Sequence, residues 1–159
     1  MNRRTALKQF FVLAGGIWIA SSCDFSAEAP SIALKQIKLT KADEELLAEL
    51  LETIIPKTDS PGAKDLKLHL FVMKMVDDCE SPENQEAFLK GLKAVPKPQI
   101  NPQTELMSYL ENLPKDDVFL RILKRRGIQG YKNSEYVMKN KLIYELVPGR
   151  YDGALKIKA

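Results

Sequence analysis

Apolar and polar residues follow a helical period along much of the chain, most clearly over residues 40–55. Thr40 and Asp43 have the spacing of a capping box, in which hydroxyl and carboxylate accept hydrogen bonds from the free amides that begin a helix. Pro56 should end this helix, because the residue before a proline avoids helical geometry. The predicted buried face consists of Leu46, Leu47, Leu50, Leu51, Ile54 and Ile55.

The same reasoning predicts further helices along the chain. Serine or asparagine followed by proline marks helix starts at Ser81 and Asn101, and Ser134 can cap a short helix. Gly127 is expected to end a helix over residues 115–126 with a left-handed cap. Strands are hard to find, so we predict an all-α domain, a small bundle of about five or six helices with an irregular C-terminal arm. The helices after the first are expected to begin at Ala63, Ser81, Pro102, Lys115 and Ser134.

Residues 1–22 have the features of a twin-arginine-type export signal. Arg3 and Arg4 are followed by an apolar run over residues 10–19, which is about half the length that a helix needs to span a bilayer. A transmembrane helix is the alternative interpretation of this run. An export signal predicts that the protein resides in the bacterial periplasm.

Small residues precede Cys23 in the order Ala-Ser-Ser-Cys, which resembles the cleavage box of bacterial lipoproteins. We therefore predict that Cys23 is lipidated and that residues 23–39 form a tether, reaching on the order of 20–25 Å as a flexible coil. The alternative is simple cleavage nearby, which would leave Cys23 free to pair with Cys79. Lipidation would attach the protein to a membrane.

Charge and composition exclude several classes of function. The formal net charge is +3, but without residues 1–22 the chain carries 21 basic and 21 acidic side chains, so nucleic acid is not an expected partner. The chain lacks the Cys-x-x-Cys-His run of a c-type haem and has two cysteines and one histidine. His69 lies four residues after Asp65, which could hold its imidazole, but it has no second histidine with which to bind a metal. We expect no cofactor and no catalytic residues in this chain.

The stretch from Gly127 to Gly153 contains four of the five tyrosines and four glycines. Aromatic side chains and arginine on irregular backbone are typical of a protein–protein interface. The alternative is a tail whose tyrosines lie back over the domain. The residues predicted to contact a partner are Tyr131, Tyr144, Pro148, Gly149, Arg150 and Tyr151.

Two separated motifs carry a resemblance to a known family. The sequences IIPKTDSPGA at 54–63 and GYKNSEYVMKNKLIYELVPGRYDG at 130–153 resemble the gluconate 2-dehydrogenase subunit 3 family, and the likeness runs from Glu44 to Leu155. This resemblance implies that residues 40–159 form a helical, non-catalytic subunit. A larger flavoprotein of the glucose-methanol-choline oxidoreductase type would carry FAD, and a cytochrome c with haem c would complete some such complexes. The turn at 56–62 is by itself sufficiently explained as a connection between helices.

Two further hypotheses compete with this interpretation. A free-standing envelope lipoprotein would act as a binding or scaffold module. An enzyme in its own right would need a phosphate-binding loop, an activated nucleophile or a metal site, and the sequence offers none of these. If the chain is a subunit, its export signal could also serve a larger partner that has none.

Overall fold

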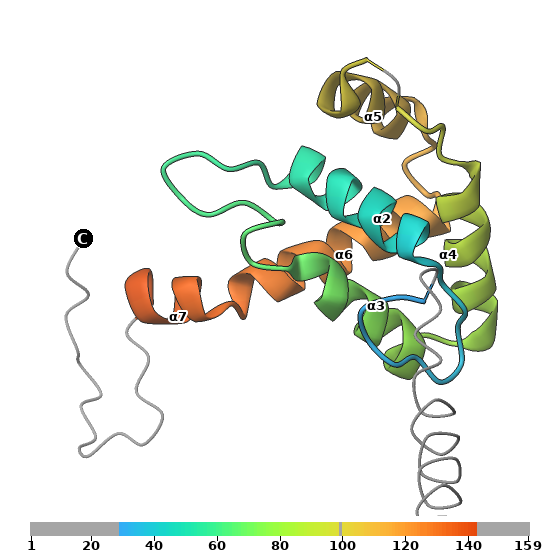
Figure 1. The fold of residues 1–159 in the computed structure, drawn as a ribbon, viewed down its shortest axis with the longest axis horizontal. Coiled ribbons are helices and arrows are strands. Elements are labelled where there is room, and N and C mark those ends of the chain that lie inside the picture. The colour runs from blue at the N-terminus through green and yellow to red at the C-terminus, as the bar shows by residue number, and fades with distance from the viewer. Residues whose placement is uncertain (1–28, 99, 143–159) are drawn as a thin grey trace, which may run out of the picture.

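The computed structural model describes residues 29–98 and 100–142, and in these ranges the protein is a small bundle of helices without strands (Figure 1). The all-α prediction is confirmed. The helices are α2 (Lys41–Ile54), α3 (Leu68–Cys79), α4 (Pro82–Ala94), α5 (Pro102–Asn112), α6 (Val118–Lys132) and α7 (Glu135–Asn140).

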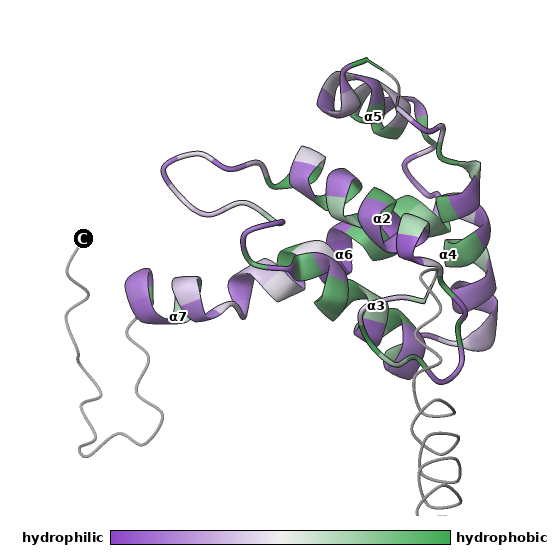
Figure 2. Cartoon of the chain, in the orientation of Figure 1, coloured by the Kyte–Doolittle hydropathy of each residue, from purple (hydrophilic) through white to green (hydrophobic). Residues whose placement is uncertain are grey.

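The core lies where α6 crosses the other long helices. α6 packs against α3 and α4, while α2 packs against α3 and also against α5, which lies at one edge of the bundle (Figure 1). The rings of Phe88 and Phe119 join α4 to α6 with centroids 5.3 Å apart. Gly91 permits this approach, because a Cβ atom there would lie 2.3 Å from Cβ of Phe119. The apolar sides of the helices face this centre (Figure 2).

Helix starts follow the predicted capping chemistry. The amide of Asp43 donates to Thr40 Oγ1 at 3.2 Å and the amide of Thr40 donates to Asp43 Oδ2 at 2.9 Å, which completes the capping box. Ser81, Asn101 and Ser134 also cap helices through their side chains, as expected.

Three predicted helix boundaries are wrong. α3 begins at Leu68 and not at Ala63, because Lys67 adopts a left-handed conformation (φ 51°) that interrupts the helix. α6 begins at Val118 and not at Lys115, because Asp117 caps it, and it continues through Gly127 to Lys132. Added Cβ atoms at Gly127 and Gly130 would lie 2.8 Å from side-chain carbons of Leu51 and Phe71, respectively. These glycines therefore serve the close approach of neighbouring helices and not the end of a helix.

The expectation of a flexible coil up to residue 39 is also corrected. Ile37 and Leu39 are buried, and a fully buried carboxylate, that of Asp77 on α3, accepts hydrogen bonds from three successive backbone amides. The donors are Lys35 at 2.9 Å, Gln36 at 2.7 Å and Ile37 at 3.0 Å. This segment is part of the folded domain.

Asp77 keeps its charge in this buried position. Burial alone would raise the pKa of the Asp77 carboxyl, but the three backbone hydrogen bonds and Lys74 lower it to about 2. The ionised form is therefore the form that holds the N-terminal segment against α3.

Candidate partner-binding surface

The loop between α2 and α3 projects from the bundle (Figure 1) and is closed at its base by one carboxylate. Oε1 of Glu52 accepts the amide of Lys57 at 3.0 Å, and Oε2 accepts the amide of Lys64 at 2.8 Å. Gly62 packs against the same carboxylate, since a Cβ atom there would lie 2.5 Å from Oε1. Residues 56–59 at the tip are exposed. The loop is thus an exposed surface on a fixed base.

The solvent-facing side of α6 carries a row of cations. α6 contains five basic residues and no acidic residue. The exposed residues of this row, which we call the α6 ridge, are Arg121, Lys124, Arg125, Ile128 and Lys132. Their spacing places them on one face of the helix.

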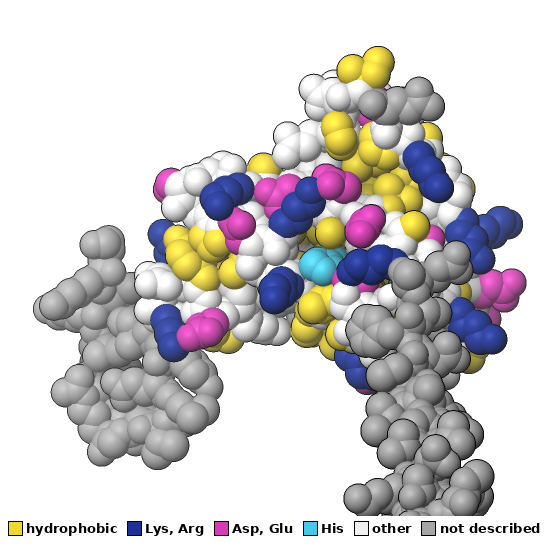
Figure 3. Space-filling view, in the orientation of Figure 1, with side chains coloured by type: hydrophobic (Ala, Val, Ile, Leu, Met, Phe, Trp, Pro, Cys, Tyr) yellow, Lys and Arg dark blue, Asp and Glu magenta, His cyan; other side chains and the backbone are white. Residues whose placement is uncertain are grey.

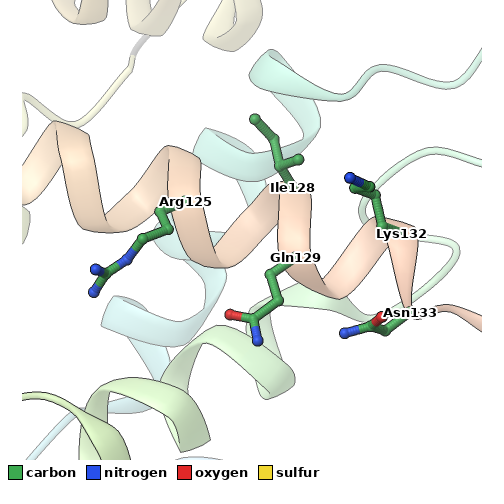
Figure 4. A pocket seen from close by; sticks show the side chains of 5 residues that line it. All are labelled: Arg125, Ile128, Gln129, Lys132 and Asn133. Carbon is green, nitrogen blue, oxygen red and sulfur yellow. The ribbon is translucent and has the colours of Figure 1, made fainter.

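A shallow depression of about 300 Å³ lies at the C-terminal half of this ridge (Figure 4). Two cationic side chains, Arg125 and Lys132, line it together with Ile128 and the side-chain amides of Gln129 and Asn133. Such a lining suits a small anionic or carbonyl group rather than an apolar ligand.

One buried carboxylate fixes the ridge to the end of α3. Oε1 of Glu80, which is 3% exposed, accepts Arg126 Nε at 2.9 Å and Arg125 Nη2 at 2.5 Å. Burial alone would raise the pKa of Glu80, but these arginines lower it below its usual value. Arg126 also donates to Gln129 Oε1 at 2.8 Å, so the carbonyl oxygen of this amide is engaged.

Neither a metal site nor a membrane-spanning helix is present among the described residues. In residues 29–98 and 100–142, His, Cys, Asp and Glu side chains form no group of three or more that could hold a metal ion. Within the same ranges, every helix is too short or too polar to cross a membrane.

Residues 41–101 match the family model of gluconate 2-dehydrogenase subunit 3. The match spans 61 of the 159 residues, and over this segment the chain is similar to the gluconate 2-dehydrogenase subunit 3 family. The recognition from sequence is therefore confirmed, and the matched segment comprises α2, the projecting loop, α3 and α4. No curated protein and no solved structure matches the chain.

The subunit 3 match ends before the tyrosine-rich motif that contributed to the resemblance. Of the six residues predicted there as partner contacts, Tyr131 lies on α6, half-buried against the core. The carbonyl oxygen of Tyr131 accepts the hydroxyl of Ser134 at 2.7 Å. The other five predicted contacts lie outside the described residues; they are Tyr144, Pro148, Gly149, Arg150 and Tyr151. Arg3, Arg4 and Cys23 also lie outside the described residues. The roles of all eight residues stay predictions.

His69 lies within the subunit 3 segment, at the surface between α2 and α3 (Figure 3). The suggestion that Asp65 holds its imidazole is wrong, because residues 63–67 are not helical and Asp65 instead pairs with Lys57 at 3.0 Å. Nε2 of His69 lies 3.7 Å from Oε1 of the buried Glu44, and the buried Nδ1 has no hydrogen-bond partner among the described residues. Burial lowers the pKa of His69 despite Glu44.

Besides Glu80, sequence reasoning missed three buried carboxylates on helices. Glu44, Glu52 and Asp77 all lie on helices among other charged residues, where they resemble members of a solvated face. The one sequence feature that pointed to a buried carboxylate is Gly62, ten residues after Glu52. A glycine at this position allows the backbone to approach the Glu52 carboxylate closely.

Proposed function

We propose that this chain is the non-catalytic small subunit of a periplasmic, membrane-associated, flavin-dependent dehydrogenase that oxidises sugars or alcohols. The family match over residues 41–101 is the observation that carries the proposal. In this proposal the larger, catalytic subunit is of the glucose-methanol-choline oxidoreductase type and binds FAD. A cytochrome c that carries haem c would be a third subunit.

The projecting loop is our candidate for the contact with the catalytic subunit. It lies inside the matched segment, and the hydrogen bonds of Glu52 order its backbone before any partner arrives. A loop that is already ordered loses less conformational entropy on binding, which favours affinity. The predicted contacts Arg150 and Tyr151 would add to this interface.

Export and membrane attachment complete the proposed role. The twin-arginine signal with Arg3 and Arg4 would carry the folded catalytic subunit together with this chain, and lipid on Cys23 would hold the complex at the membrane. Deletion of residues 1–22 should leave the flavoprotein in the cytoplasm. Unchanged export of the flavoprotein would contradict the export role but not the role as a subunit.

Co-purification from the native host tests the subunit role. Tagged chain should bring down a flavin-containing dehydrogenase, and Asp59→Arg at the exposed loop tip should reduce the recovered flavin. Asp116→Arg is the matched control, because this exposed aspartate lies outside the family segment and its replacement makes the same charge change. Arg150→Ala combined with Tyr151→Ala should also release the partner.

Recovery of the wild-type chain as a lone monomer would refute the subunit role and favour a free-standing envelope lipoprotein. Equal loss of flavin with Asp59→Arg and Asp116→Arg would refute the loop as the contact.

A further inference from the structure

The α6 ridge has no role in the subunit contact proposed above. Its residues lie outside the family-matched segment, which ends at residue 101. No carboxylate among the described residues pairs with Arg121, Lys124 or Lys132. On the side of the molecule that Figure 3 shows, by contrast, acidic and basic side chains are intermixed over α2 and the projecting loop. Among the described residues, the charge of these three cations is therefore not balanced by a carboxylate.

The dimensions of the ridge suit a flat anionic surface. From Arg121 to Lys132 the helix rises about 16 Å, and the cations along it sit on long, flexible side chains. Ile128, 49% exposed, lies between them, as in basic helices that rest at the headgroup level of a membrane. Figure 4 shows Arg125, Gln129 and Asn133 along one side of the helix and Ile128 and Lys132 along the neighbouring side.

The depression gives the ridge a place for a phosphate group. Arg125 and Lys132 would supply positive charge there, and the side-chain amide of Asn133 would supply a hydrogen-bond donor. Glu80 holds Arg125 and so limits its motion before a ligand arrives. The ionised carboxylate of Glu80 neutralises part of the charge near Arg125 and Arg126, so the unpaired residues carry most of the attraction.

We propose that the α6 ridge docks on anionic phospholipid headgroups and sets the orientation of the domain on a membrane. The docking requires neither lipid on Cys23 nor a catalytic subunit. In the docked orientation α6 faces the membrane. An acidic protein partner is the competing occupant, and the exposed Ile128 among the cations favours a lipid surface.

Vesicle co-sedimentation of the full chain tests this proposal. Partition coefficients are measured for two kinds of vesicle. One contains equal parts of phosphatidylglycerol and phosphatidylcholine, and the other contains phosphatidylcholine alone. The measured quantity is the first coefficient divided by the second. The N-terminal stretch with Arg3, Arg4 and Lys8 is the same in wild type and variants, so its contribution cancels when their ratios are compared. Each basic side chain near an anionic surface should raise the ratio roughly five-fold, and added salt should weaken it.

The variant Arg121→Gln with Lys124→Gln should lower the ratio roughly 25-fold if both side chains lie at the lipid surface. Lys90→Gln with Lys93→Gln is the matched control, since it removes two exposed positive charges from α4. The control should change the ratio less than about two-fold, because those lysines lie away from the ridge. Circular dichroism of both variants checks that the fold is retained.

Three results would overturn the proposal. One is an equal ratio for wild type and the ridge variant, and another is an equal loss in the ridge and control variants, which would indicate a net-charge effect. The third is ridge-dependent binding of a polyglutamate peptide without preference for phosphatidylglycerol, which would assign the ridge to an acidic protein. These measurements use the chain without a catalytic subunit, so they test the ridge even if no flavoprotein co-purifies with the chain.

Discussion

Replacement of Asp77 by asparagine should detach the N-terminal segment from α3 and destabilise the domain. The fully buried carboxylate accepts the amides of Lys35, Gln36 and Ile37, whereas an asparagine side chain has one neutral acceptor for these three donors. Folding lowers the pKa of Asp77 from 3.8 to about 2. That shift corresponds to roughly 2.5 kcal/mol of stability at neutral pH.

The pH dependence follows from the direction of this shift. Since the folded pKa is depressed, the stabilisation is fully present above about pH 4 and is lost as the pH falls through about 2. Urea unfolding of wild type and Asp77→Asn should differ by roughly 2–3 kcal/mol at pH 7, and the difference should shrink toward pH 2. Hydrogen exchange of the amides of residues 35–37 should accelerate in the variant.

Asp78→Asn is the matched control for this experiment. The carboxylate of Asp78 is 39% exposed and pairs with Lys74, without accepting a backbone amide from the N-terminal segment. Its replacement should cost less than about 1 kcal/mol. Equal stabilities of the two variants, or unchanged exchange at residues 35–37, would refute the assignment of Asp77 as the group that holds this segment.

Three further perturbations test other parts of the structure. Gly91→Ala should lower stability in thermal unfolding by about 1–3 kcal/mol, because the new methyl group meets Phe119; stabilisation by the higher helix propensity of alanine would contradict the packing. Glu52→Gln should cost about 1–3 kcal/mol in urea unfolding and speed exchange of the loop amides, and unchanged exchange would contradict the anchoring role. NMR titration should place the pKa of His69 below 6.5, because burial disfavours the charged imidazole. The free energy of unfolding should then increase as the pH rises toward 6.5. A pKa above 6.5 would mean that attraction to Glu44 outweighs burial.

The starts of α2, α4, α5 and α7 could be predicted because they depend on chemistry within four residues. Thr40 with Asp43, Ser81 with its following proline, and Ser134 each satisfy local amides, so the sequence alone specifies them. The all-α class was predictable for the same reason, since helical periodicity is a local property.

Two of the predictions that failed depend on contacts between distant residues. Gly127 resembles a helix end until Leu51 is seen packed against it. The segment at residues 35–39 resembles a flexible tether because its partner, Asp77, lies about 40 residues away in sequence. Tertiary packing, not local propensity, sets both, whereas Lys67 has no sequence feature that marks its left-handed conformation.

The candidate surface was predictable only in part. The loop at 54–63 drew attention through the family motif, but its anchor Glu52 looks like any other acid on an amphipathic helix. Lys124, Arg125 and Arg126 directly precede Gly127, and at a predicted helix end there they would stabilise the helix dipole. Because α6 extends to Lys132, these residues lie in mid-helix, and that explanation fails for them.

Purification of the tagged chain from membranes of its native host tests the central claim most directly. The account predicts that the chain elutes with a larger flavoprotein, that flavin absorbance follows both chains, and that sugar or alcohol oxidation resides in the larger chain alone. Elution of the chain by itself, or turnover by the isolated chain, would contradict the account.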